Sequence, residues 1–277
     1  MRFYPLQPEG SCQPIWVSAV LHGDRFLLFK WLYIYTQGNK SHKRNEGDDG
    51  MTSSLNIAGD PSEAVKITWL GHSMFLLDDG VGHRLVTDPY DAHVGYALPD
   101  VEADLVLVSH GHGDHSNVGL VKGNPMVIQS TIDEIVDGIP IKGYATYHDG
   151  RGGAERGSNI VYRWQMRDLT FVHLGDLGHV ISHELIDNLA NPDVLFVPVG
   201  GYFTIDDAQA EEVVKALAAR IAIPMHFKNA ACGFPIQTEE PFLSRFERVT
   251  RAGKQPVFIS KNDIPAETHI LLMDYIT

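Results

Sequence analysis

The sequence predicts an α/β fold in which two mixed β-sheets pack face to face and helices lie on the outside. From Val65 onward, about twelve short runs have the composition of β-strands, and only four segments have a helical period. Some of the runs alternate apolar and polar side chains, whereas others are apolar throughout. Because the first kind suits a strand with one buried face and the second a strand with two, the mixture favours a layered sandwich.

The predicted strands recur along the chain without a repeat of fixed period, which argues against a solenoid or a propeller. They occupy residues 65–70, 73–77, 84–89, 104–110, 126–130, 144–148, 159–166, 169–176, 194–201, 221–227, 256–260 and 269–276.

The four predicted helices lie between and after these strands, at residues 131–138, 181–190, 206–221 and 240–253. In the third, Asp206 precedes Gln209 by three residues, the spacing of a capping box, and apolar residues up to Ile221 recur on one face. The fourth has Pro241 at its start and Gly253 at its end, the asymmetry expected of helix termini.

The beginning of the chain differs from the rest. It lacks a repeated strand or helix pattern and includes the polar stretch "QGNKSHKRNEGDDG", which cannot form a packed core. We therefore expect residues 1–61 to be a poorly ordered appendage and residues 62–277 to form a single domain. Met51 would make a natural start, so the residues before it are interpreted as a tag or an over-long gene model.

Composition narrows the class of protein. The formal net charge is -13, and residues 51–277 carry -14 of it, because residues 1–50 hold six basic and five acidic side chains, a net of +1. Nucleic-acid binders usually carry a basic patch, so no nucleic-acid partner is expected. The longest apolar stretch, residues 25–35, is interrupted by Lys30 and is too short to span a bilayer. With no secretory signal and two dissimilar cysteine segments, the cytoplasm is the expected compartment.

The stretch "VLVSHGHGDHSN" at residues 106–117 carries the chemistry. His110, His112, Asp114 and His115 place four ligand-type side chains within six residues, directly after an apolar run typical of a buried strand. The intervening glycines allow a tight turn that can direct these side chains at a common point. Neutral imidazole and carboxylate together suit zinc, manganese or iron, so the stretch predicts a metal site.

Three further candidate ligands follow other predicted strands. His148 ends the run 144–148, Asp176 ends 169–176, and His226 lies near the end of 221–227. Each precedes a glycine, a turn or a polar loop. We expect them to lie with the histidine-rich turn at one end of the sandwich.

These residues resemble the signature of the metallo-β-lactamase fold hydrolases, which is H-x-H-x-D-H followed by a lone His, an Asp and a final His. Residues 65–277 are similar to the L-ascorbate-6-phosphate lactonase-like branch in "ITWLGHSMFLL", "VTDPY", "HLGDLGH", "VPVGGYFT" and "IPMHF". There is a more distant likeness to the N-acylphosphatidylethanolamine phospholipase D group. The resemblance implies an αββα sandwich and a hydrolase domain over residues 62–277.

The resemblance also implies the division of ligands between two metal ions. One ion takes His110, His112 and His148, the other takes Asp114, His115 and His226, and Asp176 bridges them. His173 and His179, which flank Asp176, are the rivals of His148.

Two more residues are candidates for roles beside the metals. Asp88 ends a predicted strand and is expected to hold a ligand imidazole by its outer N–H, the alternative being a turn aspartate before Pro89. His72 in "GHS" either donates a proton near the metals or is an ordinary core histidine. The proton that the leaving group needs is expected from Asp114, His72 or His179.

The glycine-rich loop "DGRGGAERGSN" at residues 149–159 lacks the Gly-Lys-Ser/Thr ending of a phosphate-binding P-loop. It is interpreted as a segment lining the site, in which Arg151 or Arg156 is a candidate to meet an anionic substrate.

The sequence thus predicts a metal-dependent hydrolase in which a hydroxide held by two metal ions, zinc before manganese or iron, cleaves an ester, lactone or phosphodiester bond of a small molecule. One alternative is a nuclease of the same fold, which the acidic composition disfavours. Another is a di-iron oxidoreductase, which usually has a Glu where this chain has Gly111 and Gly113. Family members often form oligomers, so a homo-oligomer is also open.

Overall fold

The structure is a computed structural model that describes residues 55–276. Most of the predicted appendage, with the proposed start at Met51, lies outside the described residues. Residues 55–61 pack on the domain: Leu55 is buried in the core, and Gly59 donates a backbone hydrogen bond to the Phe258 carbonyl. The division at residue 61 stays a prediction.

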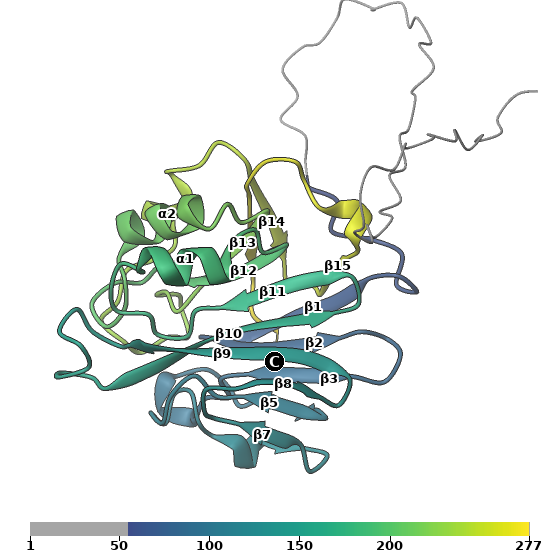
Figure 1. The fold of residues 1–277 in the computed structure, drawn as a ribbon, viewed down its shortest axis with the longest axis horizontal. Helices are drawn as coiled ribbons and strands as arrows, with labels where there is room; N and C mark the ends of the chain where they lie inside the picture. The colour runs from purple at the N-terminus through teal and green to yellow at the C-terminus, as the bar shows by residue number, and fades with distance from the viewer. Residues whose placement is uncertain (1–54, 277) are drawn as a thin grey trace, which may run out of the picture. The chain divides into compact units, whose positions relative to one another are not determined.

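One sheet has six strands and mixed direction (Figure 1). Its order is β15 (Val257–Ile259), β1 (Val65–Gly71), β2 (Met74–Asp78), β3 (Arg84–Thr87), β5 (Leu105–Leu107) and β7 (Met126–Ile128). The pairs from β15 to β3 are antiparallel, and β3, β5 and β7 run parallel.

The other sheet has eight strands and is also mixed. Its order is β14 (Val249–Gly253), β16 (His269–Met273), β13 (Ile221–Met225), β12 (Val194–Pro198), β11 (Leu169–His173), β10 (Ser158–Met166), β9 (Ile139–Tyr147) and β8 (Asp133–Val136). Neighbours from β14 to β11 are parallel and those from β11 to β8 antiparallel. Two short strands, β4 (Val101–Glu102) and β6 (Val121–Lys122), form a separate pair.

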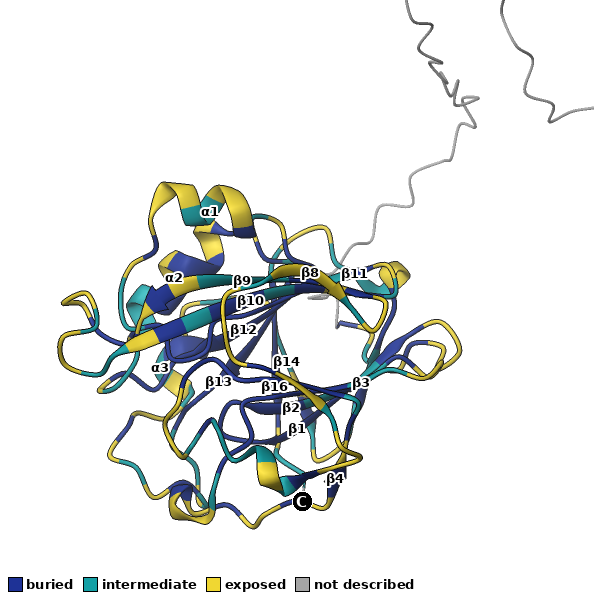
Figure 2. Cartoon of the chain, turned by 60° about the horizontal axis from the view of Figure 1, so that its bottom comes forward, coloured by how far each residue is buried: buried dark blue, intermediate teal, exposed yellow. Residues whose placement is uncertain are grey.

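The main core lies between the two sheets. Phe75 of β2 meets Phe196 of β12 with ring centroids 4.4 Å apart, and Trp164 of β10 stacks on Phe196 from the same sheet. All three side chains are fully buried, and aromatic pairs of this kind add packing energy beyond their buried area. Figure 2 shows that buried residues run along the strands of both sheets.

Alternate residues of the six-stranded sheet enter two different cores. In β5, Leu105 and Leu107 face the main core, whereas Val106 and the following Val108 join a second cluster with Tyr90 and Val94. Side chains alternate across a strand, so β5 is buried on both faces, as its continuous apolar run predicts.

Three α-helices occur in the described residues: α1 (His183–Leu189), α2 (Asp207–Ala216) and α3 (Glu240–Leu243). They lie by the eight-stranded sheet, where α2 contacts β12 (Figure 1). The second core cluster contains no α-helical residue and is covered by loops and by the 3₁₀ turns η1 (Ala92–Val94) and η2 (Val118–Leu120). A third 3₁₀ turn, η3 (Lys261–Asp263), follows β15. The predicted fold class is confirmed, with the α-helices gathered beside one sheet.

The helix predicted at residues 131–138 is wrong, because the segment forms strand β8 and a tight hairpin with β9. Val136 pairs with Ile139 across Asp137 and Gly138, whose φ angles are 49° and 77°. An Asp-Gly pair with positive φ at both positions is the preferred two-residue hairpin turn.

Two other predicted helices are too long. The segment 240–253 begins as α3, but the helix ends at Leu243 and Val249–Gly253 forms β14, which pairs with β16. The segment 206–221 is α2 only to Ala216: Ala218 takes a positive φ of 49°, and Ile221 starts β13. Pairing with neighbouring strands thus overrides helical periodicity.

The predicted capping box of α2 is confirmed. The Asp206 carboxylate accepts the Gln209 backbone N–H at 2.9 Å, and the Gln209 side chain accepts the Asp206 N–H at 3.2 Å.

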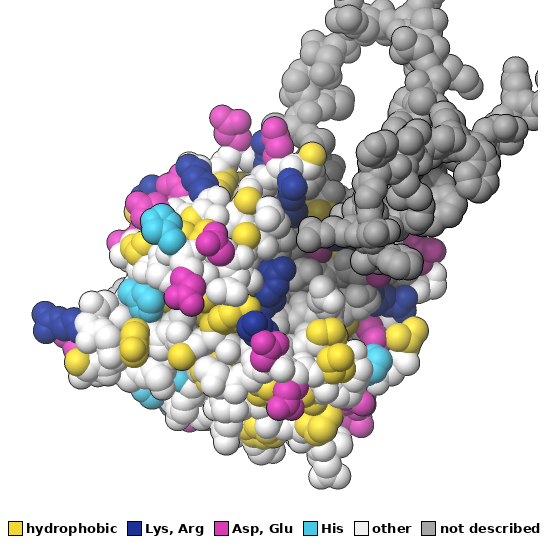
Figure 3. Space-filling model, in the orientation of Figure 1, with side chains coloured by type: hydrophobic (Ala, Val, Ile, Leu, Met, Phe, Trp, Pro, Cys, Tyr) yellow, Lys and Arg dark blue, Asp and Glu magenta, His cyan; other side chains and the backbone are white. Residues whose placement is uncertain are grey.

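Acidic and basic side chains are interspersed on the face shown in Figure 3 and do not gather by sign. Within residues 55–276, no helix is long and apolar enough to cross a membrane.

We expect Asp206→Ala to lower the free energy of unfolding by about 1 kcal/mol, because the first turn of α2 loses its cap. Urea denaturation followed by circular dichroism measures this. Asp187→Ala, an exposed position on α1, is the control and should change stability by less than about 0.5 kcal/mol. Equal effects of the two substitutions would show that the Asp206 cap does not contribute to the free energy of unfolding as expected.

Candidate metal centre

The predicted site residues lie at one end of the sandwich, each just beyond the C-terminal end of a strand. In the six-stranded sheet, His72 follows β1, Asp88 follows β3, and the turn with His110 follows β5. In the eight-stranded sheet, His148 follows β9, Asp176 follows β11, and His226 follows β13. The strands therefore act as a rigid scaffold that carries the polar side chains on its loops.

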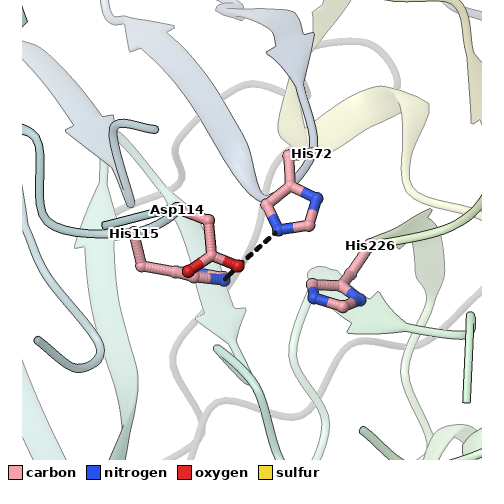
Figure 4. Close-up of side chains that lie close together, drawn as sticks. All are labelled: His72, Asp114, His115 and His226. Carbon is pink, nitrogen blue, oxygen red and sulfur yellow. Dashed lines mark ion pairs between the residues drawn. The ribbon is translucent and has the colours of Figure 1, made fainter. Parts of the chain in front are cut away.

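Two separate groups of ligand-type atoms form there, and a third group, His110, His115 and Asp176, joins them. His110, His112 and His148 offer ring nitrogens that all lie within 4.8 Å of one another. The His110 Nε2 and His112 Nδ1 atoms face each other at 3.0 Å. The second group consists of His72, Asp114, His115 and His226, whose ligand atoms also lie within 4.8 Å of one another, and Figure 4 shows these four side chains converging.

Asp176 lies between the two groups. Its Oδ2 atom is 3.1 Å from His148 Nε2 and 4.0 Å from His110 Nε2. The same oxygen is 3.2 Å from His115 Nε2 and 3.3 Å from His226 Nε2. One buried carboxylate oxygen therefore touches imidazoles of both groups.

The outer nitrogens of three imidazoles are held by neighbours. His115 Nδ1 donates to Asp88 Oδ2 at 2.9 Å, and His148 Nδ1 donates to the Phe203 carbonyl at 3.1 Å. Ser109 Oγ donates to Asp88 Oδ2 at 2.7 Å and lies 3.0 Å from His110 Nδ1. In each case Nε2 is left facing the cluster, the orientation that metal-ligating histidines use. Asp88 thus lies where the sequence predicts it.

A buried amide fixes the backbone of Asp176. Asn159 Oδ1 accepts the Asp176 N–H at 2.9 Å, and Asn159 Nδ2 donates to Thr146 Oγ1 and to the Leu174 carbonyl. The flanking Gly175 has a φ of 55°, and a Cβ there would overlap Asn159. The "LGD" segment therefore needs its glycine to bring the carboxylate into the cluster.

The residues present fit a divalent metal. Among the described residues, several buried polar atoms in the cluster have no hydrogen-bond partner: His72 Nδ1 and Nε2, His115 Nε2, Asp176 Oδ1, and His226 Nδ1 and Nε2. Buried polar groups are nearly always hydrogen-bonded, so unpartnered ones gathered at one point call for another partner. Imidazole nitrogens and carboxylate oxygens are donors that zinc and similar ions accept.

The charges of the cluster are coupled. Burial raises the pKa of Asp176, but the charges of His115 and His226 outweigh this and hold the pKa well below its usual range. Burial lowers the pKa of His115, whereas Asp176 and Asp88 raise it well above the usual value. For His110, burial is the main cause that lowers the pKa to about 3, so this imidazole is neutral at pH 7, the form that binds metals.

The structure separates His148 from its two rivals. His173 Nε2 donates to the Ser73 carbonyl, and its Nδ1 accepts the Gly175 N–H. His179 Nε2 accepts the Tyr147 N–H at 3.3 Å, and its Nδ1 donates to the Val180 carbonyl at 2.9 Å. Both nitrogens of each rival are engaged, and neither residue joins the ligand groups.

His72 lies inside the cluster, which the sequence left open. Its side chain is completely buried, its Nε2 lies 3.4 Å from Asp114 Oδ2, and its ring is 4.2 Å from that of His226. His72, Asp88 and His226 have φ angles of 51°, 38° and 52°. Left-handed backbone at non-glycine residues is strained and clusters at functional sites.

The cluster opens into a cavity of about 270 Å³. Its lining consists of His93, His112, Asp114, His148, Arg156, Asp176, Phe203, His226 and Phe234. Of these, His93, Phe203 and Phe234 were missed by the sequence analysis, as was Asn159 behind the site. Phe203 falls within the segment "VPVGGYFT" and Asn159 ends the glycine-rich loop, but neither pattern indicates a role for these side chains. His93 and Phe234 lie outside the motifs.

Comparison with known proteins agrees with the geometry. Residues 66–226 match the family model described as beta-lactamase superfamily domain. The chain belongs to this superfamily.

Similar proteins are described as metal-dependent hydrolases. A UPF0173 metal-dependent hydrolase of Archaeoglobus fulgidus is 29% identical over 211 residues, which are 64% of this chain and 87% of that protein. One from Thermoplasma acidophilum is 33% identical over 193 residues, 60% of this chain and 85% of that protein. A Thermotoga maritima crystal structure, assigned as a Zn-dependent hydrolase of the metallo-beta-lactamase superfamily, is 37% identical with a TM-score of 0.64. It covers 76% of this chain and 100% of its own.

The predicted membership and enzyme class are confirmed: the chain is a metal-dependent hydrolase of the metallo-beta-lactamase superfamily. The roles of its individual residues stay predictions.

We expect Asp88→Asn to weaken zinc binding by about 10- to 100-fold, because His115 loses the carboxylate that orients it. Competition with a chromophoric chelator measures the dissociation constant. Asp79→Asn is the matched control, since Asp79 is also buried and accepts backbone N–H groups but belongs to neither ligand group. Equal losses in both variants would contradict the role of Asp88.

Proposed function

We propose that this hydrolase holds two divalent metal ions that share Asp176, and that it cleaves an ester, lactone or phosphodiester bond of a small molecule. The observation that supports this is the position of Asp176 Oδ2, within 3.3 Å of imidazoles from both ligand groups. His110, His112 and His148 would hold one ion, and Asp114, His115 and His226 the other. Zinc is the ion we propose, with manganese and iron as alternatives.

Two divalent ions at this position would polarise the substrate oxygen and lower the pKa of a shared water toward neutrality. The chain contributes the fixed geometry. Asp88, Ser109 and the Phe203 carbonyl keep three imidazoles oriented, so little reorganisation is needed when substrate binds.

Asp114 is the residue that we propose moves the proton. Burial raises the pKa of its carboxyl, but the adjacent His72 imidazole and the charge of His115 hold the pKa below its usual range. The carboxylate is therefore ionised at pH 7 and can accept a proton at Oδ2 and pass it to the leaving atom.

His72 positions that carboxylate. Burial is the main cause that lowers the pKa of His72 to about 3, so its ring is neutral at pH 7, and its Nε2 atom lies 3.4 Å from Asp114 Oδ2, close enough to restrict where that carboxylate can lie. His179, the third predicted donor, lies outside the cluster with both nitrogens engaged, and we assign it no role in proton transfer.

The cavity supports a small substrate. Its volume of about 270 Å³ is at the low end for small-molecule sites. Larger hollows on the protein hold none of the ligand groups.

We expect Asp114→Ala to lower kcat by at least about 100-fold, the contribution typical of a proton-transfer residue. The assay uses bis-4-nitrophenyl phosphate, 4-nitrophenyl esters and a lactone panel with zinc-loaded protein. His83→Ala is the control because His83 pairs with Asp79 outside the cluster, and it should change kcat by less than about threefold. Similar losses in both variants would contradict the assignment.

We also expect chelation to abolish turnover of every substrate that the protein cleaves, and added zinc to restore it. The measurement is the initial rate before dialysis against EDTA, after dialysis, and after reloading. A rate that survives removal of all bound metal, verified by elemental mass spectrometry, would overturn the proposed mechanism.

A further inference from the structure

Within residues 55–276, one arginine that lines the cavity has no carboxylate or carbonyl partner for its side chain. Every other arginine in the described residues contacts a carboxylate or donates to a backbone carbonyl, whereas Arg156 does neither. The arginines with partners are Arg84, Arg151, Arg163, Arg167, Arg220, Arg245, Arg248 and Arg251. The Arg156 guanidinium instead lies 5.5 Å from the ring centre of Phe203 and lines the cavity beside His148 and Asp176.

A buried carboxylate holds the loop that carries this arginine. Asp149 Oδ1 accepts the backbone N–H groups of Arg151 and Gly153, and Oδ2 accepts those of Glu155 and Arg156, all at 2.8–2.9 Å. Burial raises the pKa of Asp149, but these donors outweigh it and hold the pKa below its usual range. The loop is thus ordered around an ionised carboxylate.

The loop is also tied to a candidate metal ligand. Asp149 follows His148 in the chain, and the His148 N–H donates to the Gly157 carbonyl at 3.0 Å. The Phe203 carbonyl accepts from His148 Nδ1, while the Phe203 ring lies beneath Arg156. Arg156 is therefore placed at a fixed position relative to the metal centre.

The rest of the entrance is aromatic. The rings of Phe203 and Phe234 meet edge to face at 5.8 Å, and His93 lies 5.3 Å from Phe234. An apolar wall with one unpaired guanidinium complements a ligand that has an apolar stem and an anionic end, since Arg binds carboxylate and phosphate through paired N–H donors.

We propose that Arg156 binds an anionic group of the substrate, a carboxylate or a phosphate, away from the bond that is cleaved. The stem between the two groups packs on Phe203 and Phe234. The substrate class is then a small ester or lactone with an acidic end. This inference rests on the proposed function, because it takes the metal centre as the place of cleavage.

Arg151 supplies a matched control. It lies on the same loop, but its side chain is 75% exposed, pairs with Glu155 at 3.1 Å and does not line the cavity. Removing it changes the net charge of the loop as much as removing Arg156, without touching the proposed subsite.

The test compares two ligands of equal length, glutarate and valerate, which differ by one terminal carboxylate. Isothermal titration calorimetry with the zinc-loaded full chain measures both dissociation constants. We expect glutarate to bind wild type about 10- to 100-fold more tightly than valerate, the range for a charge-assisted contact. Arg156→Ala should remove this preference, Arg156→Lys should keep part of it, and Arg151→Ala should keep it whole.

This binding test depends only on the preference for glutarate over valerate and does not require that the protein cleave either ligand. If wild type shows no preference for glutarate, or if the preference survives in Arg156→Ala, the inference is overturned. An arm with 4-phosphonobutanoate, which has the same chain length, distinguishes the two acids: a stronger Arg156-dependent preference for it than for glutarate identifies a phosphate-like group as the one recognised.

A turnover arm separates this inference from the proposed function. We expect Arg156→Ala to raise KM for mono-4-nitrophenyl glutarate by about 10-fold or more and to leave KM for 4-nitrophenyl valerate nearly unchanged. If Arg156→Ala leaves KM unchanged for both esters and chelation still abolishes turnover, the role of Arg156 is contradicted and the proposed function is not. Turnover that persists after chelation would instead contradict the proposed function.

Discussion

The structure depends on one buried carboxylate placed among imidazoles. Asp176 is 1% exposed, and its Oδ2 atom lies 3.1–4.0 Å from the nitrogens of His110, His115, His148 and His226. A buried charge without compensation is very costly, so this carboxylate requires positive charge beside it. Without metal, the His115 imidazole supplies that charge, because its raised pKa keeps it protonated. The unpartnered nitrogens around Asp176 are suited to divalent ions. Asn159 accepts the backbone N–H of Asp176 and so fixes where this carboxylate lies.

The two sheets must pack together before this environment exists. His110 and His112 follow β5 of the six-stranded sheet, but His148, which completes their group, follows β9 of the other sheet. The second group is divided in the same way, because His72, Asp114 and His115 come from the six-stranded sheet and His226 from the eight-stranded one. The main core, with Phe75 against Phe196, therefore sets the distance between the halves of both groups. Substitutions in that core are expected to change how the two sheets pack and so to shift the ligand side chains relative to one another.

Much of the site could be predicted from the sequence because ligand chemistry limits the choice of residue. Imidazole and carboxylate after a buried strand indicate a metal, so His110, His112, Asp114 and His115 stand out locally. His148, Asp176 and His226 needed the added observation that each ends a β-run. By contrast, Asn159, Phe203 and Phe234 act through contacts with residues 13 or more positions away, which no local pattern encodes. The helix predicted at 131–138 was wrong for a related reason: the Asp137-Gly138 turn and pairing with β9 decide that segment.

Zinc titration of the metal-free protein tests most directly whether Asp176 joins two metal ions in one centre, as we propose. Chelator competition gives the number of ions bound per chain and how strongly each binds, without any assumption about substrate. We expect two ions in wild type and a loss of affinity for both in Asp176→Ala, since one carboxylate oxygen lies within 3.2 Å of imidazoles from both groups. A single ion in wild type, or an Asp176→Ala variant in which one ion binds as tightly as before, would contradict it.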